Sequence, residues 1–165
     1  MEPEMRKALE DQRKLLVLVW SGFISALVIY LLIPQFISVS ELSPGPGSFS
    51  DILRTPLWIV ALAEFGVLWW WNNRFLTKEA VLKEMTVLQK LSENQAVSSY
   101  AGKKIVAFAL AESIAIYGLV LALIGNHLSD QYLMTLIAGL WLVYLYPSGA
   151  FFEDLAREFE ARGAG

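Results

Sequence analysis

The sequence predicts an all-α, polytopic membrane protein: a four-transmembrane-helix bundle with an amphipathic cytoplasmic helix between the second and third spans. Three observations carry this prediction: high hydropathy, four apolar stretches of bilayer length, and a one-sided distribution of basic residues. The 165-residue chain is 56% hydrophobic with a mean hydropathy of +0.49, which is too apolar for an ordinary soluble domain. A chain of this length accommodates one core, so we expect a single membrane domain over residues 1–165.

Four stretches meet or approach the roughly 20 apolar residues that a helix needs to cross a bilayer. They run approximately over residues 15–33, 56–76, 105–124 and 132–152. Proline lacks the amide proton and suits the first helical position, so Pro34 is expected to end the first span and Pro56 to open the second. Gly125-Asn126 should close the third span. The Pro-Ser-Gly segment 147–149 should kink or end the fourth.

Basic residues predict the orientation of these spans. Apart from Arg54, every Lys and Arg lies before the first span, after the fourth, or in the central region that runs from Arg74, at the end of the second span, to Lys104, before the third. Basic residues favour the cytoplasmic side, so both termini are expected in the cytoplasm. The Trp triplet 69–71 ends the second span, where indole rings favour the headgroup boundary; a cofactor-stacking role is the alternative.

The connection 77–103 is predicted to be cytoplasmic and helical. From Thr77 to about Gln95 it is amphipathic, so it either extends the second span or lies on the membrane surface. Its apolar face comprises Val81, Leu82, Met85, Leu88 and Leu91. The tail from Glu153 to Arg162 is expected to form another short helix, with charge pairs four residues apart. These pairs are Glu153–Arg157 and Glu158–Arg162.

Composition excludes several classes of function. The chain has no cysteine, which excludes disulfides, thiolate metal sites and Cys nucleophiles. The single His127 cannot form a multi-histidine metal site. A formal net charge of −3 argues against a nucleic-acid partner. No Ser-His pair, HExxH sequence or phosphate-binding glycine loop is present, so no catalytic residue, no cofactor and no enzyme activity are expected.

Two acids lie inside predicted spans: Glu64 in the second and Glu112 in the third. A charge near the bilayer centre costs about 3 kcal/mol, so desolvation favours the neutral acids. A neutral carboxyl can form a hydrogen bond to the next helix, as a structural contact, or release its proton to a water path or cation. Both roles remain open, as does direct contact between the two acids. The candidate hydroxyl partners are Ser25, Tyr30, Ser113 and Tyr117.

Small residues recur on one face of the third span. Because small residues allow close helix packing in lipid, this face should pack inside the bundle or against another copy. Glu112 lies on its flank and should therefore face protein. The face comprises Ala107, Ala111, Ala115, Gly118, Ala122 and Gly125.

The sequence ALAESIAIYGLVLALIG, residues 109–125, resembles the second helix of the c-subunit (proteolipid) of rotary ATP synthases, typically ALAE-x-x-AIYGLV-x-A. The resemblance covers about 17 residues. It implies that Glu112 is an ion-binding carboxylate, with Ser113 and Tyr117 as hydroxyl ligands and Glu64 as an extra ligand. As a whole, the chain is similar to a group of small four-span bacterial membrane proteins, which implies the bacterial inner (plasma) membrane.

These observations favour a non-enzymatic subunit or accessory protein of a larger inner-membrane assembly. Its expected partners are the lipid bilayer and other membrane-protein subunits, or further copies of the chain. The alternative is proton or sodium translocation or sensing through Glu112.

Overall fold

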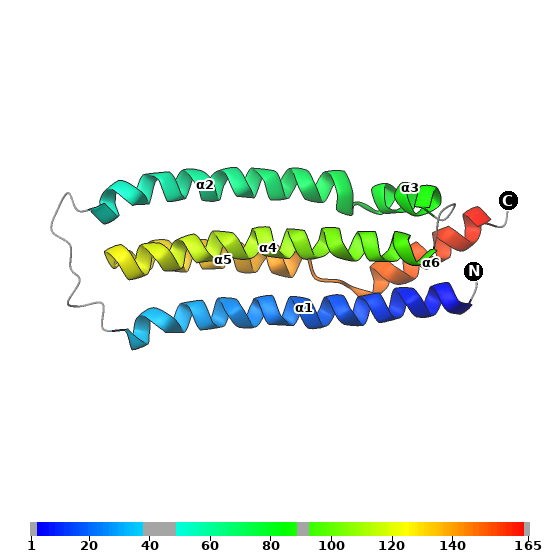
Figure 1. Cartoon of the computed structure of the whole chain (residues 1–165), viewed down its shortest axis with the longest axis horizontal. Coiled ribbons are helices and arrows are strands. Elements are labelled where there is room, and N and C mark those ends of the chain that lie inside the picture. The colour runs from blue at the N-terminus through cyan, green and yellow to red at the C-terminus, as the bar shows by residue number, and fades with distance from the viewer. Residues whose placement is uncertain (1–2, 38–48, 89–92, 164–165) are drawn as a thin grey trace.

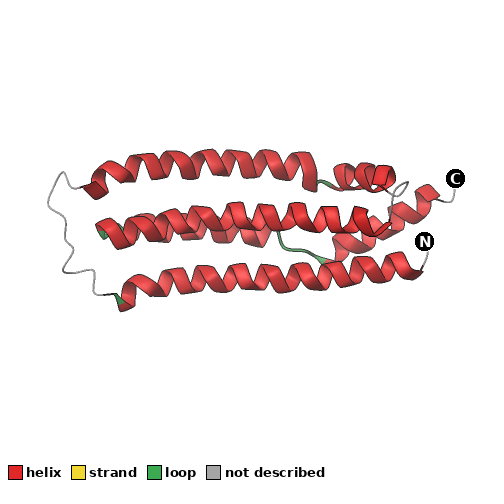
Figure 2. Ribbon diagram, in the orientation of Figure 1, coloured by secondary structure: helices red, strands yellow, loops and turns green. Residues whose placement is uncertain are grey.

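The computed structural model describes residues 3–37, 49–88 and 93–163, with side chains for 7–37, 51–83 and 98–158. Every regular element in these ranges is helical (Figures 1 and 2). In chain order the elements are α1 (Pro3–Phe36), α2 (Phe49–Trp71), the π-helical turn η2 (Asn72–Leu76), α3 (Lys78–Leu88), α4 (Glu93–Gly125), α5 (Leu128–Tyr144) and α6 (Gly149–Gly163).

Consecutive long helices run antiparallel along the long axis of the molecule, with both chain termini at one end (Figure 1). We call this the terminal end, and the opposite end, with the α4–α5 turn, the turn end. Helix α4 packs against α1, α2 and α5. Four helical stretches are long and apolar enough to cross a membrane, as the hydropathy predicted. They are Lys7–Phe36, Asp51–Leu76, Ser98–Gly125 and Leu128–Glu158.

The two expected helix ends at prolines are wrong. Helix α1 continues past Pro34 to Phe36, and α2 begins at Phe49 with Pro56 inside it. A proline removes one backbone hydrogen bond and crowds one carbonyl, and neighbouring helices can compensate for this loss. In α2 the residues before Pro56 contact the α4–α5 turn, as shown below, and this contact supports the additional turns.

The two glycine-containing boundaries are confirmed. Helix α4 ends at Gly125, and Asn126 has a φ of 54°. The Asn126 and His127 amides donate to the Ala122 and Leu121 carbonyls at 3.0 and 3.3 Å, which closes the helix in a Schellman-like arrangement. Helix α5 ends at Tyr144 and α6 begins at Gly149, so the predicted fourth span is interrupted next to Pro147.

The predicted connection 77–103 is divided between two helices. Helix α3 is separated from α2 by η2 and by Thr77 in an extended conformation. Helix α4 begins at Glu93, so the residues before 105 continue the third long helix. Of the predicted apolar face, Val81 and Leu82 are buried. Leu91 and the Met85 and Leu88 side chains lie outside the described residues, as does most of the loop 41–50.

Helix α3 packs against α4 and α6 at the terminal end. The Lys78 Nζ atom lies 2.7 Å from Glu158 Oε1, which joins α3 to α6. The expected Glu153–Arg157 pair is present at 4.0 Å. The predicted partner of Glu158, Arg162, lies outside the described side chains.

The small-residue face of α4 packs inside the bundle. Its six members are buried, and Ala107, Ala111, Ala115 and Ala122 have no exposed surface. At Gly118 the α5 backbone comes so close that an added Cβ would lie 2.9 Å from Gln131 Cα. The sequence left open whether this face packs inside the bundle or against another copy of the chain. In the structure it packs inside the bundle, against α5.

Candidate functional site

Glu64 joins α2 to α4 through two hydroxyl groups. The Ser113 Oγ atom lies 2.5 Å from Glu64 Oε2, and the Tyr117 hydroxyl donates to Glu64 Oε1 at 2.8 Å. Ser113 and Tyr117 are four residues apart on α4, so they lie on the same face of that helix. One carboxyl on α2 thus contacts two successive turns of its neighbour.

The Ser113 hydroxyl also lies 2.8 Å from the Leu110 carbonyl oxygen. A hydroxyl group has one proton to donate, and a carbonyl oxygen can only accept. Both contacts of Ser113 are hydrogen bonds when Glu64 is protonated and its O–H donates to Ser113 Oγ. The hydrogen-bond geometry is therefore satisfied by a neutral Glu64.

Glu112 joins α4 to α1. The Tyr30 hydroxyl donates to Glu112 Oε1 at 2.7 Å. Ser25, another predicted partner, instead donates to the Ser21 carbonyl within its own helix at 2.8 Å. Three of the four candidate hydroxyls, those of Tyr30, Ser113 and Tyr117, are therefore confirmed as partners of Glu112 or Glu64.

The two acids have separate sets of partners. Glu112 and Ser113 are adjacent, so their side chains leave α4 about 100° apart, one toward α1 and the other toward α2. The hydroxyls that the c-subunit resemblance assigned to Glu112 are used by Glu64 in this structure. Contacts between a carboxyl and a hydroxyl therefore join α4 to two neighbours on different faces, to α1 through Glu112 and to α2 through Glu64.

Polar groups continue from Tyr30 into α5. The Gln131 Nε2 atom donates to the Tyr30 carbonyl, so Tyr30 links α4 through its hydroxyl and α5 through its backbone. The Gln131 side-chain oxygen and the Thr135 hydroxyl are buried, and neither has a hydrogen-bond partner among the described residues. The contact region of α1, α4 and α5 is thus more polar than hydropathy indicates.

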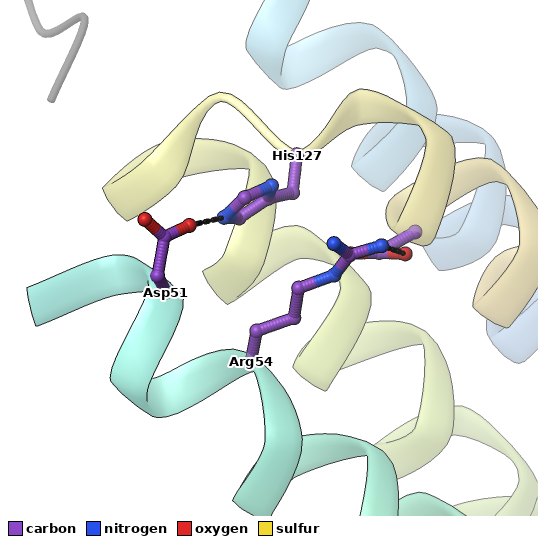
Figure 3. Close-up of polar contacts among 4 residues, drawn as sticks. Asp51, Arg54 and His127 are labelled. Atoms are coloured by element: carbon purple, nitrogen blue, oxygen red, sulfur yellow. Dashed lines mark hydrogen bonds and ion pairs between the residues drawn. The ribbon is translucent and has the colours of Figure 1, made fainter. Parts of the chain in front are cut away.

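A second polar cluster, which the sequence analysis missed, lies at the turn end (Figure 3). Arg54 of α2 donates to Asp130 of α5 through Nε at 2.7 Å and Nη2 at 3.0 Å. The Asp130 side chain is only 7% exposed, so this two-point contact neutralises a buried carboxylate. His127 Nε2 lies 3.6 Å from Asp51 Oδ1. Together these contacts fix the first turns of α2 on the α4–α5 turn.

A signal for this cluster was present in the sequence. Asp51 and Arg54 are three residues apart, as are His127 and Asp130, so each pair lies on one helix face. Both pairs border predicted spans on the side that otherwise lacks basic residues. The order acid–base in one pair and base–acid in the other is complementary for two helices that run in the same direction, as α2 and α5 do from the turn end.

The described side chains include no group of three or more His, Cys, Asp or Glu residues that could hold a metal ion. Comparison of the chain with models of known protein families, with curated protein sequences and with solved structures finds no match.

Proposed function

We propose that this chain is a non-enzymatic subunit or accessory protein of a larger assembly in the bacterial inner membrane. It crosses the membrane four times, with both termini in the cytoplasm. The observation that carries the proposal is the engagement of both span acids by hydroxyls of neighbouring helices. Glu64 and Glu112 stabilise the bundle by forming hydrogen bonds between neighbouring helices.

The energetics of lipid support this role for the acids. The hydrophobic effect does not drive helices together in a bilayer, because lipid tails are as apolar as the side chains. Helix association there depends on van der Waals packing and interhelical hydrogen bonds. Glu64 and Glu112 attach the outer helices α2 and α1 to the central α4. Helix α5 uses close backbone contact at Gly118 instead. All three contacts converge on α4, which organises the bundle.

The distribution of charge supports the orientation. Arg54 is the basic residue nearest the turn end, and Asp130 neutralises it. The other described basic residues lie toward the terminal end, which the positive-inside rule places in the cytoplasm. Trp69 and Trp70 expose their rings at the corresponding end of α2, at the depth expected for a headgroup boundary.

A groove between α2 and α5 supports the assembly role. It has a volume of about 380 Å³ and extends about two helical turns. Phe65 and Trp69 form one wall, and Leu140, Trp141 and Tyr144 form the other. Apolar ridges of a partner helix would gain packing contacts here that flexible lipid tails provide less well. A transmembrane helix of another subunit is the proposed occupant.

Mild-detergent purification followed by native mass spectrometry tests this proposal. The wild-type chain should retain a membrane-protein partner, or a second copy, at fixed stoichiometry. Leu140→Trp would fill the groove and should reduce the retained partner at least about tenfold. Leu133→Trp is the matched control, because it makes the same change on the same face of α5 two turns away. A wild-type chain that remains a partner-free monomer contradicts the proposal.

Ion translocation or sensing through Glu112 is the second candidate. One observation favours it: Glu112 Oε1 accepts from Tyr30, whereas no hydrogen bond involves Oε2 among the described residues. A free carboxyl oxygen inside a span is available to a proton or a cation.

Carbodiimide labelling separates this candidate from a purely structural role. If Glu112 carries an ion, it should be labelled in preference to Glu64 at low pH and be protected by the transported ion. Glu112→Gln should then abolish proton or sodium flux in proteoliposomes, with Glu64→Gln as the control. Unchanged flux in Glu112→Gln eliminates the candidate.

A further inference from the structure

A cavity of about 450 Å³ lies between α1 and α6 at the terminal end. Leu9 and Phe152 are buried and form its apolar wall. Arg13 of α1 and Gly149, the first residue of α6, also line it. The volume lies within the range of small-ligand sites, roughly 300–1,000 Å³.

The Arg13 guanidinium is held at the start of α6. A Cβ added at Gly149 would lie 3.1 Å from Arg13 Cζ, so the glycine leaves the space that the guanidinium uses. The Arg13 Nε atom is buried and has no hydrogen-bond partner among the described residues. The first amides of a helix also lack partners within it, although Phe151 N–H donates to Ser148 Oγ at 3.4 Å. An acceptor in the cavity would satisfy the guanidinium.

The charges around the cavity leave Arg13 unbalanced. Glu10 lies 3.0 Å from Lys14, and Glu153 lies 4.0 Å from Arg157. Four charged residues line the cavity: Glu10, Arg13, Glu153 and Arg157. Both acids have a cation partner on their own helix, whereas Arg13 forms no ion pair within the described side chains. An anion is the ligand that this arrangement favours.

The position along α1 indicates which anions would reach the cavity. Arg13 precedes Leu15, the start of the first apolar stretch, by two residues, or about 3 Å along the helix. With the membrane insertion proposed above, on which this inference rests, the guanidinium lies at the headgroup level of the cytoplasmic leaflet. Anionic lipids are concentrated there, and basic pockets between helices bind their headgroups.

We propose that this cavity binds a phosphate group through the Arg13 guanidinium, and that an anionic phospholipid supplies it. The planar guanidinium fork matches two phosphate oxygens at once. The apolar wall formed by Leu9 and Phe152 accommodates the adjoining glycerol and the beginning of an acyl chain. The chain would thus carry one anionic lipid as a bound component.

Native mass spectrometry of the full chain, released from nanodiscs with equal phosphatidylglycerol and phosphatidylcholine, tests the proposal. The wild-type chain should retain one phosphatidylglycerol in preference to phosphatidylcholine. Arg13→Gln should retain at least about tenfold less. Lys7→Gln, an equal charge change on the exposed surface of α1, should behave as wild type. Gly149→Val leaves the charge unchanged but displaces the guanidinium, and it should reproduce the loss.

Titration with inorganic phosphate distinguishes the source of the anion. If phosphate binds the lipid-free chain with Arg13-dependent affinity and no lipid is retained, the site is a phosphate site supplied from solution. Equal phosphatidylglycerol retention by wild type, Arg13→Gln and Lys7→Gln would overturn the proposal, as would equal loss in both variants. The same spectra report the protein partner, whose retention should not change in Arg13→Gln. A failure of lipid binding is therefore separable from a failure of the proposed assembly role.

Discussion

Replacing Gly118 with leucine should lower the free energy of unfolding by about 3 kcal/mol. At this position an added Cβ would lie 2.9 Å from Gln131 Cα and 3.0 Å from Met134 Cβ. The first contact is with backbone, which cannot rotate away, so the side chain must push α4 and α5 apart. That separation would also strain the hydrogen bond from Gln131 to the Tyr30 carbonyl. Unfolding in SDS titrations, followed by circular dichroism, measures the change.

Gly22→Leu is the matched control for this prediction. Gly22 lies within the first apolar stretch, and an added Cβ there would have no neighbour within 4 Å. The same substitution should leave stability unchanged or raise it slightly, because leucine is the better helix former. Equal destabilisation by both variants would show that the α4–α5 contact at Gly118 is not as close as the structure indicates.

Replacing Glu64 with leucine should lower the free energy of unfolding by about 1–2 kcal/mol. The change removes the acceptor of the Tyr117 hydroxyl and the partner of Ser113. Interhelical hydrogen bonds in membrane proteins contribute about 0.6 kcal/mol on average and up to about 1.7 kcal/mol. Ser113 keeps its hydrogen bond to the Leu110 carbonyl in this variant. Most of the lost stability therefore comes from the missing hydrogen bond of Tyr117. The SDS titration used for Gly118 measures this loss.

Glu64→Gln is the informative control, because an amide keeps one acceptor oxygen and can donate to Ser113, as the neutral acid does. It should retain stability within about 0.5 kcal/mol of wild type. If glutamine were as destabilising as leucine, the neutral form of Glu64 assigned from the hydroxyl contacts would be wrong.

Much of the fold followed from hydropathy. The four long apolar helices, the end of α4 at Gly125 and the break near Pro147 were predictable, because length and backbone chemistry are local properties. The small-residue face of α4 was also predictable, since its spacing defines a helix face. The sequence alone left open whether it packs within the chain. Contact with α5 at Gly118 answers that question.

The pairing of the polar groups was harder to predict. Assigning Tyr30 to Glu112 and Tyr117 to Glu64 requires the rotation of each helix about its axis, which depends on packing against all its neighbours. The turn-end contact between Arg54 and Asp130 joins residues far apart in the chain. This contact stabilises the helical turns of α2 that precede Pro56. Because proline acts only on its own turn, its presence alone could not predict those turns.

The central claim is that Glu64 and Glu112 stabilise the packing of α2 and α1 on α4 through hydrogen bonds. A double-mutant cycle between Glu64 and Tyr117 tests this claim most directly. The cycle compares the unfolding free energies of wild type, Glu64→Leu, Tyr117→Phe and the double variant. A structural hydrogen bond predicts a coupling of about 0.5–1.5 kcal/mol, because the second change costs less once the partner has gone. If the losses of unfolding free energy in the two single variants simply add in the double variant, with no coupling beyond error, the claim is contradicted and Glu64 has no structural role through Tyr117.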